Sequence, residues 1–130
     1  MEALKAAGVR RVILVGPNPE WREPLPRSLL KYAKADLLHR IPDRMNYNLD
    51  EVAIKSDREF SNWISGTGAI YLSPMSFLCN EEGCLARVQE NGHTDLSAYD
   101  AHHLTTVGSQ YLAGRIFPTF FETLPARVNP

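Results

Sequence analysis

Three of the four histidines of this chain and two of its carboxylates fall within residues 93–105, His-Thr-Asp-Leu-Ser-Ala-Tyr-Asp-Ala-His-His-Leu-Thr. In this cluster Asp100 and His103 stand three residues apart. In a tight turn the carboxylate can accept a hydrogen bond from Nδ1–H of the imidazole, which leaves Nε2 free to take a proton from a nucleophile. The pair is therefore a candidate orienter and general base. The alternative is a solvated capping interaction without catalytic meaning.

The same cluster also contains groups that bind metals. Imidazole and carboxylate groups suit zinc, and His102 could join His93, Asp95 and His103 in a ligand set. Nothing in their spacing places three of these groups on one side. We therefore expect no metal and no cofactor, and keep a small metal protein as a third alternative.

Cys79 and Cys84 are the two cysteines of the chain, separated by Asn-Glu-Glu-Gly. Four intervening residues, with Gly83 able to adopt a positive φ, can close a small disulfide loop if the two Cα atoms approach within about 7 Å. A disulfide would indicate an oxidising compartment. The spacing leaves open the alternative of two free thiols in a cytosolic protein.

The elements that must position these residues alternate between strands and helices. Apolar runs at residues 9–16 and 69–72 predict two buried strands. Helical spacing of apolar residues predicts helices at residues 27–38 and 48–66, and a last helix that begins after Thr105 or Thr106 and ends near Pro118. The order favours a parallel, three-layer α/β sheet. The stripe that we expect the second helix to bury is Leu49, Val52, Ala53, Phe60, Trp63 and Ile64.

Composition narrows the class of protein. With 44% apolar and 22% charged residues, the 130 residues fit one globular domain, residues 1–130. The 14 basic and 15 acidic side chains are interleaved, which argues against a nucleic-acid partner. The apolar runs are far shorter than the roughly 20 residues of a membrane-spanning helix. The first residues lack the pattern of a signal peptide.

The cysteine loop, a turn at Asn91-Gly92 and residues 100–108, Asp-Ala-His-His-Leu-Thr-Thr-Val-Gly, together resemble the end of a known domain. It is the SGNH hydrolase domain fused to bacterial membrane O-acyltransferases that acetylate cell-surface polysaccharides. The strand and proline-rich loop at residues 8–19 also look like that family, so the resemblance covers nearly the whole chain. It implies a flavodoxin-like three-layer α/β/α fold, with residues 12–15 and 69–72 as neighbouring parallel strands.

The resemblance also implies a function. The family signature Asp-x-x-His-Leu-Ser/Thr-x-x-Gly supplies the base and its orienter, which map onto His103 and Asp100. It implies acyl-ester hydrolysis or O-acyl transfer on a cell-surface carbohydrate, a membrane acyltransferase domain in the parent protein, a Cys79–Cys84 disulfide and a periplasmic location. In the proline-rich loop, Asn18 and Trp21 are weak candidates for sugar contact, and packing of Trp21 against the loop is the favoured alternative.

The resemblance leaves one part of the chemistry unaccounted for. The family's nucleophile lies in a Gly-Asp-Ser block at the start of its domain, and no Gly-Asp-Ser occurs in this sequence. We therefore expect this chain to be the C-terminal portion of a longer domain, with the serine supplied by other sequence. An unpaired strand edge would favour self-association. The alternative function is a catalytically inert carbohydrate-binding or interaction module of the same fold.

Overall fold

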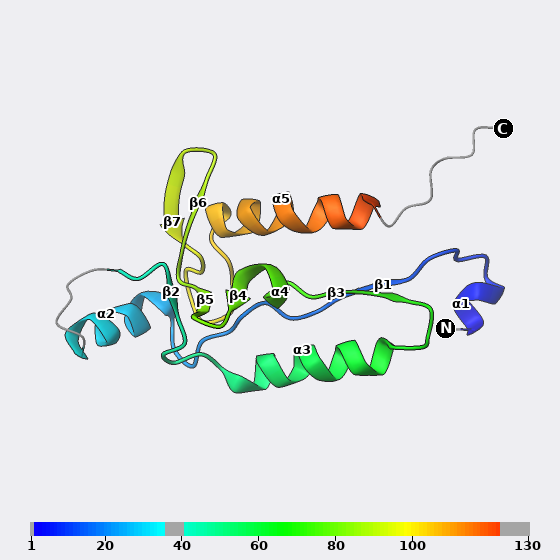
Figure 1. Cartoon of the computed structure of the whole chain (residues 1–130), viewed down its shortest axis with the longest axis horizontal. Helices are drawn as coiled ribbons and strands as arrows, with labels where there is room; N and C mark the ends of the chain where they lie inside the picture. Colours follow the sequence, from blue (N-terminus) through cyan, green and yellow to red (C-terminus); the bar gives the residue numbers. More distant parts are fainter. Residues whose placement is uncertain (1, 36–40, 123–130) are drawn as a thin grey trace.

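The computed structural model describes residues 2–35 and 41–122 (Figure 1). The elements in chain order are α1 (Glu2–Ala6), β1 (Ile13–Val15), α2 (Leu25–Ala35), β2 (Arg44–Met45), α3 (Glu51–Ile64), β3 (Ile70–Leu72), α4 (Met75–Leu78), β4 (Cys79–Asn80), β5 (Gly83–Leu85), β6 (Arg87–Glu90), β7 (His93–Leu96) and α5 (Thr106–Glu122). None of the helices in the described ranges is long and apolar enough to cross a membrane.

The two strands predicted as parallel neighbours are paired. β1 runs parallel to β3 with Val15 opposite Leu72, and α3 and α5 lie on opposite sides of the pair (Figure 1). The Tyr71 hydroxyl donates a hydrogen bond of 2.7 Å to Asp57 of α3, so Tyr71 faces α3. Because side chains alternate along a strand, Leu72 faces α5. The pair with its flanking helices is a mixed α/β arrangement, and the wider flavodoxin-like sheet stays a prediction.

The hydrophobic core lies beyond the carboxyl ends of β1 and β3. Trp21 is 1% exposed and packs at its centre. The other members come from α2, β2, β5 and nearby loops: Leu25, Leu29, Met45, Cys84, Ala86 and Ala98. Burying large apolar side chains of this kind stabilises a fold by roughly 1.5–3 kcal/mol each. This core holds the proline-rich loop, the cysteine hairpin and the histidine cluster together.

Helix α3 begins as predicted and buries a different stripe from the one predicted. Asp50 is its N-cap, and its Oδ1 accepts a hydrogen bond of 2.8 Å from the backbone N–H of Val52. Ala53 and Ile64 are buried, but Val52 is 69% exposed and Trp63 72% exposed. The predicted stripe is therefore wrong in part. The two-stranded pair β1–β3 is narrow, and it covers the side of α3 that carries Ala53 and Ile64 but not the adjoining side that carries Val52 and Trp63.

Several short elements escaped the sequence prediction. β2, β4 and β5 form an antiparallel sheet in the order β2-β5-β4, and α4 is a single turn of helix. Two to four residues are too few to show a hydrophobic period. The turn recognised at Asn91 and Gly92 joins β6 and β7 in an antiparallel hairpin, and both residues have positive φ. Helix α5 continues through Pro118, so its predicted end is wrong.

Candidate functional site

Asp100 and His103 face each other across a tight turn. Oδ2 of Asp100 lies 2.8 Å from Nδ1 of His103. Oδ1 accepts two backbone hydrogen bonds, from the N–H of His102 at 2.8 Å and from that of His103 at 2.7 Å. The carboxylate therefore fixes both the backbone and the ring of His103. The ring remains accessible, because 66% of the His103 side chain is exposed.

These hydrogen bonds determine the charge of Asp100. Donation from the backbone N–H groups of His102 and His103, then from the His103 side chain, lowers the pKa of Asp100 to about 2. Asp100 is consequently a carboxylate throughout the pH range in which enzymes normally act. An ionised partner at Nδ1 orients the imidazole and stabilises its protonated form when Nε2 accepts a proton.

A second aromatic ring covers one face of the imidazole. Tyr99 stacks on His103 with ring centroids 5.7 Å apart and planes 13° apart. The turn is closed beneath the rings by a hydrogen bond of 3.1 Å from the Tyr99 N–H to the His103 carbonyl and by a bridge between Ala98 and Leu104. Tyr99 was not among the candidate residues predicted from the sequence. Its signal was an aromatic residue four positions before the candidate base, inside the same turn.

His102 points away from its neighbour. Its Nδ1 lies 3.2 Å from Oε2 of Glu20, and its ring stands at 85° to the His103 ring. Glu20 lies in the proline-rich loop. Two backbone hydrogen bonds also join that segment to the turn, from Trp21 N–H to the Ala101 carbonyl at 2.9 Å and from Leu25 N–H to the Asp100 carbonyl at 3.2 Å. The loop after β1 thus supports the Asp-His turn.

The start of α5 holds the turn from its other end. Thr105 is the N-cap, because its Oγ1 accepts a hydrogen bond of 3.0 Å from the Gly108 N–H. The same hydroxyl donates to the Leu96 carbonyl at 2.6 Å. A Cβ at Gly108 would lie 2.2 Å from the carbonyl oxygen of Ser97. The glycine of the Asp-x-x-His-Leu-Thr-x-x-Gly signature therefore permits close packing of α5 against the turn.

The cysteines form the predicted disulfide. Cys79 and Cys84 lie opposite each other in the β4–β5 hairpin, with Cα atoms 3.9 Å apart. At Gly83, which has φ 120°, a Cβ would lie 2.4 Å from the backbone of Met45. The hairpin continues into residues 85–86, whose carbonyls accept the hydroxyl and the N–H of Ser97 at 2.5 and 3.0 Å. The disulfide therefore stiffens the approach to the Asp-His turn.

The side chains of the other sequence candidates do not join the Asp100–His103 pair. Trp21 is buried in the core. Its burial supports the packing role and does not support contact between its ring and a sugar. Asn18 is half-buried in the same loop. His93 is exposed on β7, and no three His, Cys, Asp or Glu side chains in the described ranges gather as a metal-ligand set.

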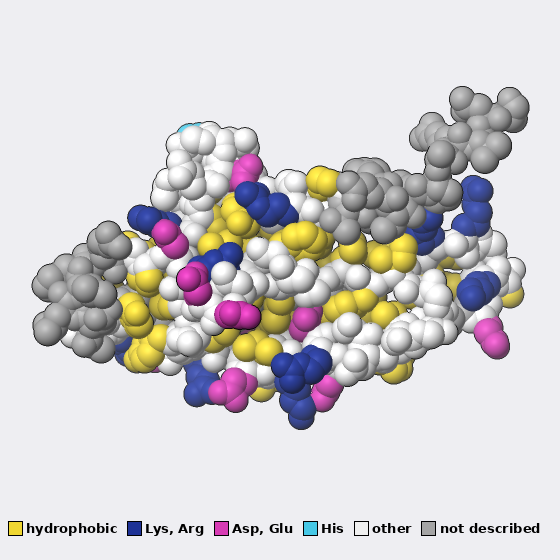
Figure 2. All heavy atoms as spheres, in the orientation of Figure 1, with side chains coloured by type: hydrophobic (Ala, Val, Ile, Leu, Met, Phe, Trp, Pro, Cys, Tyr) yellow, Lys and Arg dark blue, Asp and Glu magenta, His cyan; other side chains and the backbone are white. Residues whose placement is uncertain are grey.

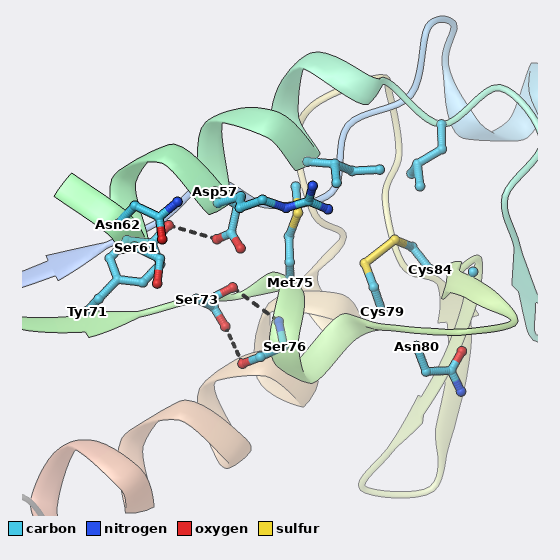
Figure 3. Close-up of a pocket in the computed structure, with 14 residues that line it drawn as sticks. Asp57, Ser61, Asn62, Tyr71, Ser73, Met75, Ser76, Cys79, Asn80 and Cys84 are labelled. Carbon is cyan, nitrogen blue, oxygen red and sulfur yellow. Dashed lines mark hydrogen bonds between the residues drawn. A yellow bond between two sulfur atoms is a disulfide. The ribbon is translucent and has the colours of Figure 1, made fainter. Parts of the chain in front are cut away.

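A cleft of about 510 Å³, lined by both polar and apolar side chains, opens between α3, the end of β3 and the disulfide (Figure 3). Asp57 and Tyr71 are hydrogen-bonded on one side of it, and Ser73 and Ser76 are hydrogen-bonded below. Burial, and then the hydrogen bond and negative charge of Asp57, raise the pKa of Tyr71. The cleft lies at the carboxyl end of a parallel strand, where α/β sheets bind ligands. Sequence reasoning missed it because its residues are scattered along the chain.

Comparisons with known proteins identify a family model and a solved structure that are similar to this chain. Residues 1–118 match the family model described as "SGNH domain (fused to AT3 domains)". The structure matches that of the periplasmic domain of a lipopolysaccharide acetyltransferase from Salmonella ser. Paratyphi A, with a TM-score of 0.77 and 34% sequence identity. The match covers 91% of this chain and 44% of that chain, so this chain spans less than half of its length. A comparison with curated proteins found no match.

These matches bear on the compartment as well as on the fold. The matched structure is a periplasmic domain, and the Cys79–Cys84 disulfide requires an oxidising environment of that kind. The periplasmic location and the disulfide expected from the sequence are confirmed.

Proposed function

The chain belongs to the family of SGNH domains that are fused to AT3 domains, and we propose that it carries the general base and the orienter of an O-acyl transfer site. His103 is the base and Asp100 its orienter. The observation that carries the proposal is the 2.8 Å contact between Asp100 Oδ2 and His103 Nδ1, made by a carboxylate whose other oxygen is fixed by two backbone N–H groups.

Acyl transfer of this kind needs a nucleophile. The family's nucleophile lies in a Gly-Asp-Ser block, and this sequence has no such block. A serine hydroxyl from the remaining part of a flavodoxin-like SGNH domain attacks the acyl carbonyl and passes its proton to Nε2 of His103. His103 then returns the proton to the departing alcohol, which leaves an acyl-serine. A sugar hydroxyl or water then attacks the acyl carbonyl and gives its proton to His103. The acyl–serine bond breaks and His103 returns the proton to the serine oxygen, which gives transfer or hydrolysis.

The matched relative supports a proposal for the substrate class. The matched protein is an acetyltransferase of lipopolysaccharide, and we propose an acyl ester on a cell-surface carbohydrate as the substrate here. The parent protein contains a membrane acyltransferase domain of the AT3 type as the partner that delivers acyl groups. The cleft beside α3 offers hydroxyl, amide and carboxylate groups, beside apolar side chains, to such a carbohydrate.

The second candidate is a carbohydrate-binding module without catalysis. The cleft beside α3, with polar and apolar groups in its lining, favours it together with the absence of a Gly-Asp-Ser block from this sequence. In that case the Asp100–His103 pair only caps the turn before α5.

Hydrolysis of p-nitrophenyl acetate tests the first candidate against the second. The assay compares two versions of a fusion between this chain and the part of the Salmonella domain that lies outside the match. One version keeps His103 and the other carries His103→Ala. General-base assistance contributes typically 10²–10⁴-fold, so we expect a loss of that size. A serine-directed phosphonate should label the parent fusion. Equal hydrolysis by parent and variant would reject the catalytic role and leave the binding module.

A further inference from the structure

The contact with Asp100 does not by itself fix the plane of the His103 ring. The His103 side chain is 66% exposed, and its Nδ1 lies 2.8 Å from Oδ2 of Asp100. One hydrogen bond locates that nitrogen but leaves the ring free to swing about the contact, because the χ2 torsion of histidine has broad minima. Nε2, on the other side of the ring, changes its direction with each such swing. A base held only in this way would not keep Nε2 aimed at a nucleophile.

The ring of Tyr99 supplies a second restraint. It lies against the His103 ring with centroids 5.7 Å apart and planes 13° apart. Offset stacking at a centroid separation of about 4.5–7 Å is a favoured arrangement of aromatic rings. A nearly parallel partner resists rotation of the imidazole out of its plane. Asp100 and Tyr99 therefore restrain the His103 ring at two different places, its Nδ1 atom and one of its faces.

Exposure alone does not distinguish Tyr99 from other aromatic residues. Tyr99 is 60% exposed. Apolar side chains also lie elsewhere on the surface, as Figure 2 shows between the regions that α5 and α3 occupy in Figure 1. Single exposed apolar residues are normal in soluble proteins. The distinguishing observation for Tyr99 is its parallel partner, which is the candidate base.

The backbone of the turn is closed without the Tyr99 ring. The Tyr99 N–H donates a hydrogen bond of 3.1 Å to the His103 carbonyl, and Ala98 and Leu104 form a bridge. Oδ1 of Asp100 accepts two further backbone N–H groups of the turn. All of these bonds use backbone groups or the Asp100 carboxylate, and none uses the tyrosine ring. The ring can therefore be replaced without opening the turn, and its stacking acts on the imidazole.

We propose that Tyr99 is a positioning residue for the base. Its ring holds the plane of the His103 imidazole and closes one face of it, so that Nε2 keeps one direction and the acyl group approaches from a side that Tyr99 leaves open. Catalytic groups need to stay within about 10–20° of the productive geometry. The inference rests on the proposed function for the role of His103 as base, whereas the restraint on the ring follows from the stacking alone.

Hydrolysis of p-nitrophenyl acetate by the fusion that keeps His103 tests the effect on the reaction. Tyr99→Leu removes the stacking, and we expect kcat to fall about threefold to tenfold with little change in KM, because a stacked pair restrains a ring by about that factor. Tyr99→Phe keeps the ring and should retain the parent kcat. The matched control is Tyr47→Leu, which removes the tilted pair of Tyr47 with Tyr32, centroids 5.9 Å apart, and should leave kcat unchanged.

NMR spectroscopy of this chain tests the stacking without any reaction. We expect nuclear Overhauser cross-peaks between the ring protons of Tyr99 and those of His103, and their counterparts in Tyr99→Phe. The His103 ring signals should move in Tyr99→Leu and stay near their parent positions in Tyr99→Phe. Thermal unfolding of each variant checks that the chain still folds. Absence of the cross-peaks from the parent chain would overturn the proposal.

The kinetic outcomes separate this inference from the proposed function. An unchanged kcat in Tyr99→Leu, combined with lost hydrolysis in His103→Ala, would overturn the positioning role and leave His103 as the base. A rise in KM alone would mean that the Tyr99 ring contacts substrate, and an equal loss of kcat in Tyr99→Phe would mean that its hydroxyl acts. Either result would also overturn the positioning role. Equal hydrolysis by the parent and His103→Ala would reject the proposed function and any role of Tyr99 in the reaction.

Discussion

Asp100 binds His103 at two points, accepting from its backbone N–H at 2.7 Å and lying 2.8 Å from its Nδ1. A residue that only capped the turn would need the first contact and not the second. The double contact links the position of the backbone to the orientation of the imidazole. It is the geometry required of an orienter for a general base.

Asp100→Asn should impair turnover more than substrate binding in the fusion with the Salmonella segment. An amide preserves much of the turn but removes the negative charge that stabilises a protonated imidazole. We expect kcat for p-nitrophenyl acetate to fall by 10²-fold or more, on the order of general-base catalysis, with little change in KM. A rise in KM alone would mean that Asp100 contacts substrate instead.

His102→Ala should have a mild effect on the same activity. Its imidazole faces Glu20 and not the Asp100 carboxylate, so its loss removes one exposed contact to the proline-rich loop. We expect a change of less than about fivefold, since an exposed contact of this kind contributes roughly 1 kcal/mol or less. Glu20→Gln is the matched control and should behave alike. Greater damage from His102→Ala than from His103→Ala would reject the assignment.

Asp100 should also make stability depend on pH. Its pKa in the folded chain, about 2, lies below its ordinary value near 3.8. The ionised carboxylate therefore stabilises the fold at pH values above that ordinary value, and this contribution is lost as the pH falls through about 2. Urea unfolding of the chain and of Asp100→Asn should show a difference at pH 6 that shrinks below about pH 4. A constant difference across this range would contradict the prediction.

Loss of the Cys79–Cys84 disulfide should cost a modest amount of stability. In the chain-entropy model a loop this short contributes about 2 kcal/mol to the free energy of unfolding. We expect this decrease for the reduced chain compared with the oxidised chain in urea. The unfolded, unreduced chain should contain no titratable thiol, and finding two would refute the disulfide.

Gly108→Ala should destabilise the chain, whereas Gly114→Ala should not. A Cβ at Gly108 would lie 2.2 Å from the Ser97 carbonyl oxygen, but one at Gly114 would have no atom nearer than 4.0 Å. We expect a loss of about 1–3 kcal/mol for the first change, because overpacking forces a shift. The second should gain up to about 1 kcal/mol from helix propensity. Equal effects in chemical unfolding would rule out close packing at Ser97.

The sequence alone determined the features that depend on near neighbours in the chain. The three-residue spacing of Asp100 and His103 is enough for a turn to bring them together, and the disulfide loop closes over five positions. The runs that became β1 and β3 are apolar enough to be recognised as buried strands, and their parallel pairing was predicted correctly.

Tertiary structure decided what depends on distant neighbours. The burial of Trp21, the exposure of Trp63 and the partnership of His102 with Glu20 each depend on which segment packs opposite, and spacing along one helix or loop does not encode that. The same is true of the open apolar face at Val15. The apolar residues of this strand predict burial, but only the fold shows that the described chain leaves them uncovered. Burial requires a second surface to pack against. The pattern of a single strand indicates that such a surface is needed but not which segment provides it.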